Sequence, residues 1–149
     1  MANSKAYDDL IMDHIKNARN FRALPDATHH ASGSNPLCGD ELAVRVTLAG
    51  DRIEEVAFEC TCCGISMASA SIMTESVRGK SGAEARAWLT AFVAALAARG
   101  DTAPAGAEPA HYALLKTIQQ FPARTRCAML PWVTLEAALN NRQEPVALT

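Results

Sequence analysis

The clearest pattern lies in the middle of the chain, where apolar and polar residues alternate on both sides of a tight turn. Residues 42–48 alternate with a period of two, residues 49–51 form an Ala-Gly-Asp turn, and residues 53–59 continue as a second apolar run. This alternation is typical of half-buried strands, and a glycine-containing turn between two such runs is typical of a hairpin. We therefore predict an antiparallel hairpin here, with a shorter strand near residues 29–34.

Helical periodicity dominates most of the remaining chain. Apolar residues spaced three and four apart predict helices over residues 4–17, 64–78, 83–99 and 110–120. The second of these is apolar on several sides, which predicts a buried helix. Residues 101–109 read as a loop, Pro122 ends the preceding helix, Cys127 follows, and residues 131–141 are expected to form the last helix before a frayed tail. A hairpin followed by a run of helices predicts an α+β fold, with a small antiparallel β-sheet packed against several helices.

Length and composition indicate an ordinary globular protein. The chain has 149 residues, of which 49% are hydrophobic and 20% charged, and we expect a single domain over residues 1–149. The net charge of −2 and the lack of a basic run argue against nucleic acid as a partner. No apolar run approaches the length of about 18 residues that a membrane span needs. The polar N-terminal segment lacks the apolar core of a secretion signal, so we expect a cytoplasmic protein.

Five cysteines then become the main candidates for chemistry. In a reducing compartment, cysteines are usually small buried residues, metal ligands or reactive thiols rather than structural disulfides. Three of them lie at junctions between predicted elements: Cys38 before the hairpin, Cys63 between strand and helix, and Cys127 before the last helix. The positive end of a following helix favours the thiolate form of Cys63 and Cys127.

Asp40 extends this set to four possible ligands. It lies two residues after Cys38, and the intervening Gly39 allows a turn tight enough for both side chains to reach one point. Three thiolates and one carboxylate suit tetrahedral zinc, and thiolates also bind iron–sulfur clusters. Spacing alone leaves two alternatives equally open: one shared site, or cysteines scattered through the core.

Four ordered segments resemble a known family. They are residues 13–20 (DHIKNARN), 35–40 (NPLCGD), 63–71 (CGISMASAS) and 121–127 (FPARTRC). With them the chain resembles the U-type iron–sulfur cluster assembly proteins, which include the SufU, IscU and NifU N-terminal proteins. It looks closer to SufU, because residues 83–109 form extra material and Arg126 stands where shorter scaffolds have histidine.

The resemblance implies a function and a site. It implies that Cys38, Asp40, Cys63 and Cys127 bind zinc, that a SufS-like cysteine desulfurase docks and hands over persulfide sulfur, and that Cys127 accepts it. Arg126 is expected beside the thiolates. The protein would be a sulfurtransferase that activates the desulfurase and passes sulfur to a downstream scaffold or apo-protein, rather than a stand-alone enzyme.

Two alternatives remain at this stage. One is a scaffold protein on which a 2Fe–2S cluster is assembled before transfer to another protein. Its cofactor would then be the 2Fe–2S cluster or iron instead of zinc. The weaker one is a structural zinc domain.

The chain also departs from the family. Cys60 and Cys62 stand where relatives usually carry small or polar residues, and both are expected on one face of the strand. They could compete for metal, resolve a persulfide into a disulfide, or have no role. Among the histidines, His14 is expected to pack or cap, and His29, His30 and His111 are expected at the surface.

Overall fold

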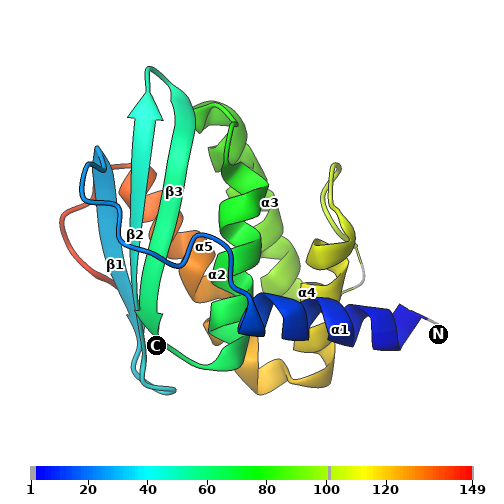
Figure 1. Ribbon diagram of the computed structural model, residues 1–149. Coiled ribbons are helices and arrows are strands. Elements are labelled where there is room, and N and C mark those ends of the chain that lie inside the picture. Colours follow the sequence, from blue (N-terminus) through cyan, green and yellow to red (C-terminus); the bar gives the residue numbers. More distant parts are fainter. Residues whose placement is uncertain (1–2, 101, 149) are drawn as a thin grey trace.

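The computed structural model describes residues 3–100 and 102–148, and it shows a twisted sheet covered on one face by helices (Figure 1). The elements follow one another as α1 (Asn3–Lys16), β1 (His29–Asn35), β2 (Asp40–Ala49), β3 (Arg52–Thr61), α2 (Gly64–Val77), α3 (Gly82–Ala98), α4 (Pro109–Gln120), the 3₁₀ turn η1 (Pro122–Arg124), α5 (Thr125–Leu139) and β4 (Val146–Ala147). The predicted α+β class is confirmed. That residues 1–149 form a single domain stays a prediction.

The sheet grows from the predicted hairpin. Its strand order is β3-β2-β1-β4, and both β1 and β3 pair with β2 in antiparallel fashion. Along β2 the even-numbered residues from Asp40 to Val46 are buried, whereas the odd-numbered residues face outward. This period of two places one face against the helices and leaves the other toward solvent.

The core lies between the covered face of the sheet and the helices. Helix α5 packs against β1 and β2, and α2 and α3 pack against α5. Large side chains from several of these elements are fully buried, among them Phe58, Phe92 and Trp132. The prediction that residues 64–78 form a buried helix is confirmed, because most residues of α2 are buried. Within the described residues, no helix is long and apolar enough to cross a membrane.

The last helix begins earlier than predicted. We expected it to start at Pro131, but α5 starts at Thr125 and contains Pro131 in its interior. A proline inside a helix has no N–H for the carbonyl four residues earlier, which here belongs to Cys127. The Ser66 hydroxyl donates a hydrogen bond to that carbonyl at 2.8 Å, so α2 supplies the missing donor. Cys127 therefore lies within the first turn of α5 rather than before the helix.

The expectation of a frayed tail was also wrong. Val146 and Ala147 form β4, which pairs in parallel with Gly33 and Ser34 of β1. The Leu148 N–H donates to the Ser34 carbonyl at 3.0 Å and extends the pairing. This contact depends on an open edge of β1 that only the assembled sheet provides. Of the loop predicted over residues 101–109, Asp101 lies outside the described residues.

Candidate metal centre

Three of the predicted ligands meet at one end of the sheet. Cys38 lies in the β1–β2 connection, Asp40 is the first residue of β2, and Cys127 comes from the first turn of α5. One ligand atom from each lies within 4.8 Å of the other two, and the described residues contain no other such group of ligand-type side chains. Residues 38 and 127 are far apart in sequence, so the packing of α5 on the sheet creates this group.

The β1–β2 connection is shaped to present Cys38. The N–H groups of Cys38 and Gly39 both donate to the Asn35 carbonyl, at 3.1 and 3.0 Å. Gly39 has a φ of 73°, a left-handed conformation that side chains disfavour. The turn leaves the Cys38 side chain exposed, while Asp40 and Cys127 are buried.

Cys63 lies beside this group, but its sulfur is not one of the three grouped ligand atoms. It is the N-cap residue of α2, and its Sγ accepts a hydrogen bond from the Ser66 N–H at 3.5 Å. Its own N–H donates to Asp40 Oδ1 at 2.9 Å. The structure therefore places the Cys63 backbone against the centre without grouping its sulfur with the other three ligand atoms. Its role as a fourth ligand stays a prediction.

The buried carboxylate of Asp40 is held by α2. The Cys63 N–H contacts Oδ1 of this carboxylate, and the Ser66 hydroxyl lies 3.2 Å from Oδ2. The single hydroxyl hydrogen is shared between Asp40 and the Cys127 carbonyl, which lies closer at 2.8 Å, so Ser66 links two of the candidate ligands. Sequence reasoning did not single out Ser66, although it lies in the segment 63–71 that carries the family resemblance.

Arg124, which the sequence analysis did not single out, contacts the sulfurs. Its guanidinium lies 3.9 Å from Cys38 Sγ. A hydrogen bond to Cys127, together with the negative charges of Cys63, Cys127 and Cys38, raises the pKa of Arg124. Arg126 is exposed and lines the cleft beside Cys38, so its predicted place near the thiolates stays a prediction of the sequence.

Burial dominates the chemistry of Cys127. It raises the pKa of the thiol, and hydrogen bonds to Cys38 and Asp40 and the charges of Cys63 and Asp40 raise it further. The Cys127 S–H donates to Cys38 Sγ at 3.3 Å. A cation placed among these groups would replace the proton and relieve the repulsion between negative ligands.

The donor set fits a metal ion. Two sulfurs on one tetrahedral zinc lie about 3.8 Å apart, given a Zn–S distance of about 2.3 Å. The sulfurs of Cys38 and Cys127 are already close to this spacing without an ion. Asn35 beside them donates its Nδ2 to Cys127 Sγ at 3.5 Å. Its Oδ1 is, among the described residues, the buried side-chain oxygen or nitrogen that has no hydrogen-bond partner.

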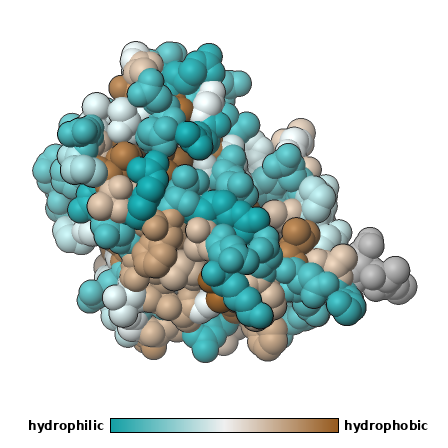
Figure 2. Space-filling model, in the orientation of Figure 1, coloured by the Kyte–Doolittle hydropathy of each residue, from teal (hydrophilic) through white to brown (hydrophobic). Residues whose placement is uncertain are grey.

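A cleft leads to the exposed thiol. It has a volume of about 410 Å³ and is lined by Cys38 together with residues of β1, the β1–β2 connection, the end of α3, η1 and α5, and by Leu148 after β4. Figure 2 shows hydrophobic residues gathered toward the lower end of the molecule, where Figure 1 places the β1–β2 connection and the turn between α4 and α5. Leu37 and Phe121, from these two turns, are 72% and 55% exposed.

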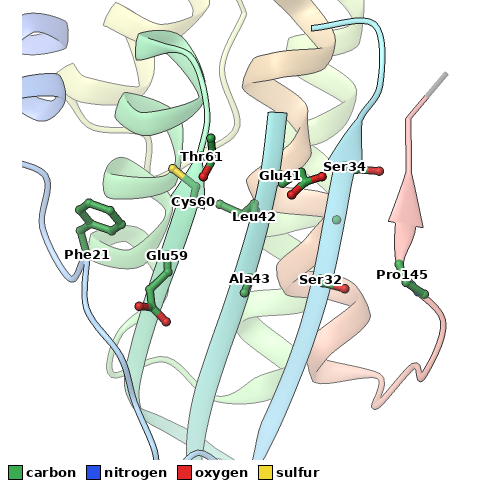
Figure 3. Close-up of a pocket in the computed structure, with 11 residues that line it drawn as sticks. Phe21, Ser32, Ser34, Glu41, Leu42, Ala43, Glu59, Cys60, Thr61 and Pro145 are labelled. Carbon is green, nitrogen blue, oxygen red and sulfur yellow. The ribbon is translucent and has the colours of Figure 1, made fainter. Parts of the chain in front are cut away.

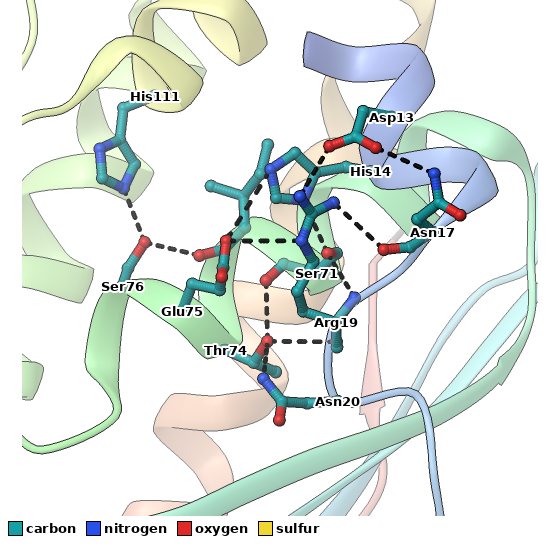
Figure 4. A network of polar contacts seen from close by, with 11 residues as sticks. Asp13, His14, Asn17, Arg19, Asn20, Ser71, Thr74, Glu75, Ser76 and His111 are labelled. Carbon is teal, nitrogen blue, oxygen red and sulfur yellow. Dashed lines mark hydrogen bonds and ion pairs between the residues drawn. The ribbon is translucent and has the colours of Figure 1, made fainter.

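A separate polar network joins α1 to α2 (Figure 4). His14 Nδ1 lies 2.7 Å from Ser71 Oγ, and the Arg19 guanidinium pairs with Asp13 at 2.6 Å. His14 is buried, as expected for a packing role. These contacts account for the sequence DHIKNARN in structural terms, because they tie the segment after α1 to the buried helix.

The surface position predicted for His111 was wrong. The ring is 3% exposed, its Nδ1 accepts from the Glu108 N–H at 2.8 Å, and its Nε2 lies 2.7 Å from Ser76 Oγ. Burial, with a smaller contribution from Lys80, lowers the pKa of His111 to about 4. Its spacing with Leu114 and Leu115 on the buried face of α4 was the signal that pointed inward.

The fold and site together define a small α+β protein with a cysteine–aspartate centre at one end of its sheet. Residues 6–128 match the NifU-like N-terminal domain family, and the chain belongs to that family.

The similarity to known relatives extends over nearly the whole chain. The zinc-dependent sulfurtransferase SufU of Bacillus subtilis (strain 168) is 37% identical over 92% of this chain and 91% of its own length. The iron–sulfur cluster assembly scaffold protein IscU of Streptococcus pyogenes serotype M1 is 34% identical over 96% of this chain and 88% of its own. The crystal structure of FiSufU from Fervidobacterium islandicum AW-1 superposes with a TM-score of 0.79 at 30% identity, covering 88% of this chain and 94% of that one.

Proposed function

We propose that this chain is a zinc-dependent sulfurtransferase of iron–sulfur cluster assembly, which accepts persulfide sulfur from a cysteine desulfurase and activates that enzyme. The convergence of Cys38, Asp40 and Cys127 at one point carries the proposal. It is supported by 37% identity over 92% of the chain to a protein named as a zinc-dependent sulfurtransferase.

The proposed zinc ligands are Cys38, Asp40, Cys63 and Cys127. When bound, zinc supplies a Lewis acid that keeps the cysteines deprotonated and restrains their reactivity. Cys63 joins the set by turning its sulfur from the Ser66 N–H toward the other three. Asp40 is the hard oxygen donor among soft sulfurs, and Ser66 together with the Cys63 N–H fixes its orientation.

The proposed sulfur acceptor is Cys127, with Cys38 as the point of entry. Cys38 is exposed to an approaching partner, whereas Cys127 is buried behind it. A released thiolate attacks the terminal sulfur of the partner's persulfide, forms the new S–S bond and returns the partner's cysteine as a thiolate. Because the sulfurs of Cys38 and Cys127 lie 3.3 Å apart, a second attack of the same kind moves the outer sulfur inward.

The surface around Cys38 suits a docked desulfurase. Leu37 and Phe121 provide exposed apolar contacts, and Arg124 and Arg126 provide positive charge next to the entry cysteine. The donor enzyme must present a persulfide on an extended loop to reach the cleft. We propose a SufS-like desulfurase as this partner.

Metal content and desulfurase activation test the proposal together. The protein purified without oxygen should contain about one zinc per chain and no visible chromophore, as a four-ligand site requires. It should accelerate sulfur release from L-cysteine by a SufS-like desulfurase, and Cys127→Ser should abolish the acceleration. Cys38→Ser separates the two thiols: retained activation would remove Cys38 from the pathway, and activation retained by Cys127→Ser would contradict the acceptor assignment.

The scaffold function is the second candidate, and one finding favours it. Relatives named as IscU scaffold proteins match this chain almost as well, at 34% identity over 143 residues. The three cysteines of the centre would then hold a 2Fe–2S cluster for transfer to apo-proteins. Iron, labile sulfide and visible absorption in the anaerobic protein would make this the leading candidate.

A further inference from the structure

Cys60 and Cys62 form a disulfide directly before Cys63, a proposed ligand of the candidate metal centre, in the sequence. Cys60 is the penultimate residue of β3, Cys62 follows that strand directly, and their sulfurs are bonded to each other. Both residues are half-buried, whereas Thr61 between them is exposed. Figure 3 shows Cys60 and Thr61 at this end of β3.

Strand register places Cys60 on the same sheet face as Asp40 of the candidate centre. Cys60 is paired with Leu42, and paired residues of an antiparallel ladder project to the same face. Leu42 and Asp40, two residues apart on β2, are both buried on the helix-covered face. Cys60 accordingly packs against the core, on the side of the sheet from which Asp40 reaches the centre.

Backbone contacts tie the pair to the candidate ligands. Cys62 is bonded through its peptide to Cys63, whose N–H donates to Asp40 Oδ1 at 2.9 Å. One end of the disulfide is thus the chain neighbour of a proposed ligand. The charge of Cys63 acts in turn on Cys127, which is the proposed acceptor.

Persulfide sulfur is at the oxidation level of elemental sulfur, and two electrons convert it to sulfide. Two thiols that can join as a disulfide supply two electrons. We propose that the Cys60–Cys62 dithiol reduces the persulfide formed at the centre and releases sulfide, so that the chain both accepts and reduces sulfur. This inference rests on the proposed sulfurtransferase function.

The reaction balances in two exchanges. The Cys62 thiol first takes the outer sulfur from the persulfide of the centre, which restores the thiol there and leaves a persulfide on Cys62. The Cys60 thiolate then attacks Cys62 Sγ, forms the Cys60–Cys62 bond and expels HS⁻, with the displaced proton giving hydrogen sulfide. Two thiols are oxidised to one disulfide, and one sulfane sulfur is reduced to sulfide. The bonded pair corresponds to the oxidised end state of these two exchanges, and an external dithiol reductant returns it to the starting state.

A single-turnover measurement tests the proposal. The reduced protein, free of added reductant and oxygen, is treated with one equivalent of glutathione persulfide. The parent should release about one sulfide per chain and gain a Cys60–Cys62 disulfide, seen by peptide mass mapping. The variant Cys60→Ser/Cys62→Ser should release roughly tenfold less sulfide and keep the added sulfur in its intact mass. Thr61→Ser is the matched control, because it alters the same segment without removing a thiol, and it should behave like the parent.

Equal sulfide release by the parent and the double variant would overturn the proposal, and so would sulfur retained by the parent. Loading by a SufS-like desulfurase with L-cysteine, run in parallel, separates this failure from failure of the sulfurtransferase function. A chain that takes no sulfur from the desulfurase, yet releases sulfide from glutathione persulfide through the pair, would refute only the proposed function. A chain that takes desulfurase sulfur and retains it would refute only the reduction step. Circular dichroism of both variants checks that each is folded.

Discussion

Asn35 has a central place at the scale of single residues, although it is not itself a candidate ligand. Its carbonyl accepts from the N–H groups of Cys38 and Gly39, and its amide donates to Cys127 Sγ. It is 1% exposed, so water does not replace these contacts. One residue therefore positions two of the cysteines. Sequence reasoning passed over it, even though it opens the segment NPLCGD.

Replacing Asn35 should weaken metal binding without removing a ligand. Asn35→Ala frees the Cys127 sulfur from its amide donor, and loss of such an outer contact typically costs roughly 10- to 100-fold in metal affinity. Competition for zinc against a chromophoric chelator measures the change. Ser34→Ala serves as the control, because Ser34 is the chain neighbour on the opposite face of β1. Unchanged affinity in Asn35→Ala would show that the amide does not support the centre.

His111 should make stability depend on pH. Its pKa is about 4 in the fold and about 6.5 when unfolded, so below pH 6.5 the unfolded state binds a proton that the folded state excludes. Stability is therefore full above pH 6.5 and is lost as the pH falls toward 4. Between pH 7 and pH 5 the free energy of unfolding should drop by about 2 kcal/mol from this group.

Urea unfolding at the two pH values, compared with His111→Gln, isolates the contribution of His111. The pKa of His14 is also lowered by burial, and it adds a change of the same sign to both proteins. The variant should consequently lose less stability than the parent between pH 7 and pH 5. An identical loss in both proteins would mean that His111 is not the responsible group.

At the scale of elements, serines of α2 connect this helix to α5 where backbone groups need partners. Ser66 bonds to the Cys127 carbonyl, which Pro131 leaves without its helical donor. Three residues further on, Ser69 donates to the Ala128 carbonyl at 2.5 Å and accepts from Trp132 Nε1 at 2.8 Å. These hydrogen bonds from small polar residues of a buried helix therefore fix the position of α5, and with it the position of Cys127, relative to α2.

Removing the Ser69 hydroxyl should destabilise the α2–α5 interface. Ser69→Ala leaves the buried Trp132 N–H without an acceptor, at a cost of about 1–3 kcal/mol in the free energy of unfolding. Denaturant unfolding of Ser69→Ala, Trp132→Phe and the double variant completes a thermodynamic cycle. The double variant should cost less than the sum of the two, because Trp132→Phe removes the donor that Ser69→Ala leaves unpaired. Strict additivity would exclude an energetic coupling between the two side chains.

At the scale of the whole molecule, the candidate metal centre lies outside the main cluster of buried apolar residues. The buried apolar residues extend through the sheet and the helices, and 49% of the chain is hydrophobic. A chain of this size buries enough apolar surface to fold without a metal. We therefore expect the rest of the fold to remain intact when the ligands of the candidate centre change, as the proposed sulfur transfer requires and a closed structural zinc site does not.

Zinc removal should leave the secondary structure in place and lower the melting temperature. Binding at 100 times the dissociation constant adds about 2.7 kcal/mol, equivalent to about 5–10 °C in a protein of this size. Circular dichroism melts of chelator-treated protein, with and without added zinc, measure the shift. Loss of helical signal upon chelation would instead favour the structural zinc domain.

The amino-acid sequence by itself determined the local structure and the identity of the candidate ligands. Alternation over residues 42–48 predicted β2, apolar periodicity predicted α2, and the junction positions of Cys38 and Cys63 followed from these elements. Local patterns carry this information because side-chain period and backbone conformation are linked within a few residues. Cys127 was added by its own junction position and Asp40 by its spacing to Cys38, and the four family segments then implied that these residues form one site.

Only the tertiary structure decided how distant residues meet. The packing of α5 on the sheet brought Cys127 to Cys38, and the distant Ser66 satisfied the carbonyl that Pro131 leaves free. Contacts between helices also buried His111 of α4, which was expected at the surface and lies against Trp88 of α3. These outcomes depend on partners from other elements, because a buried polar group is stable only where another segment supplies its hydrogen bond.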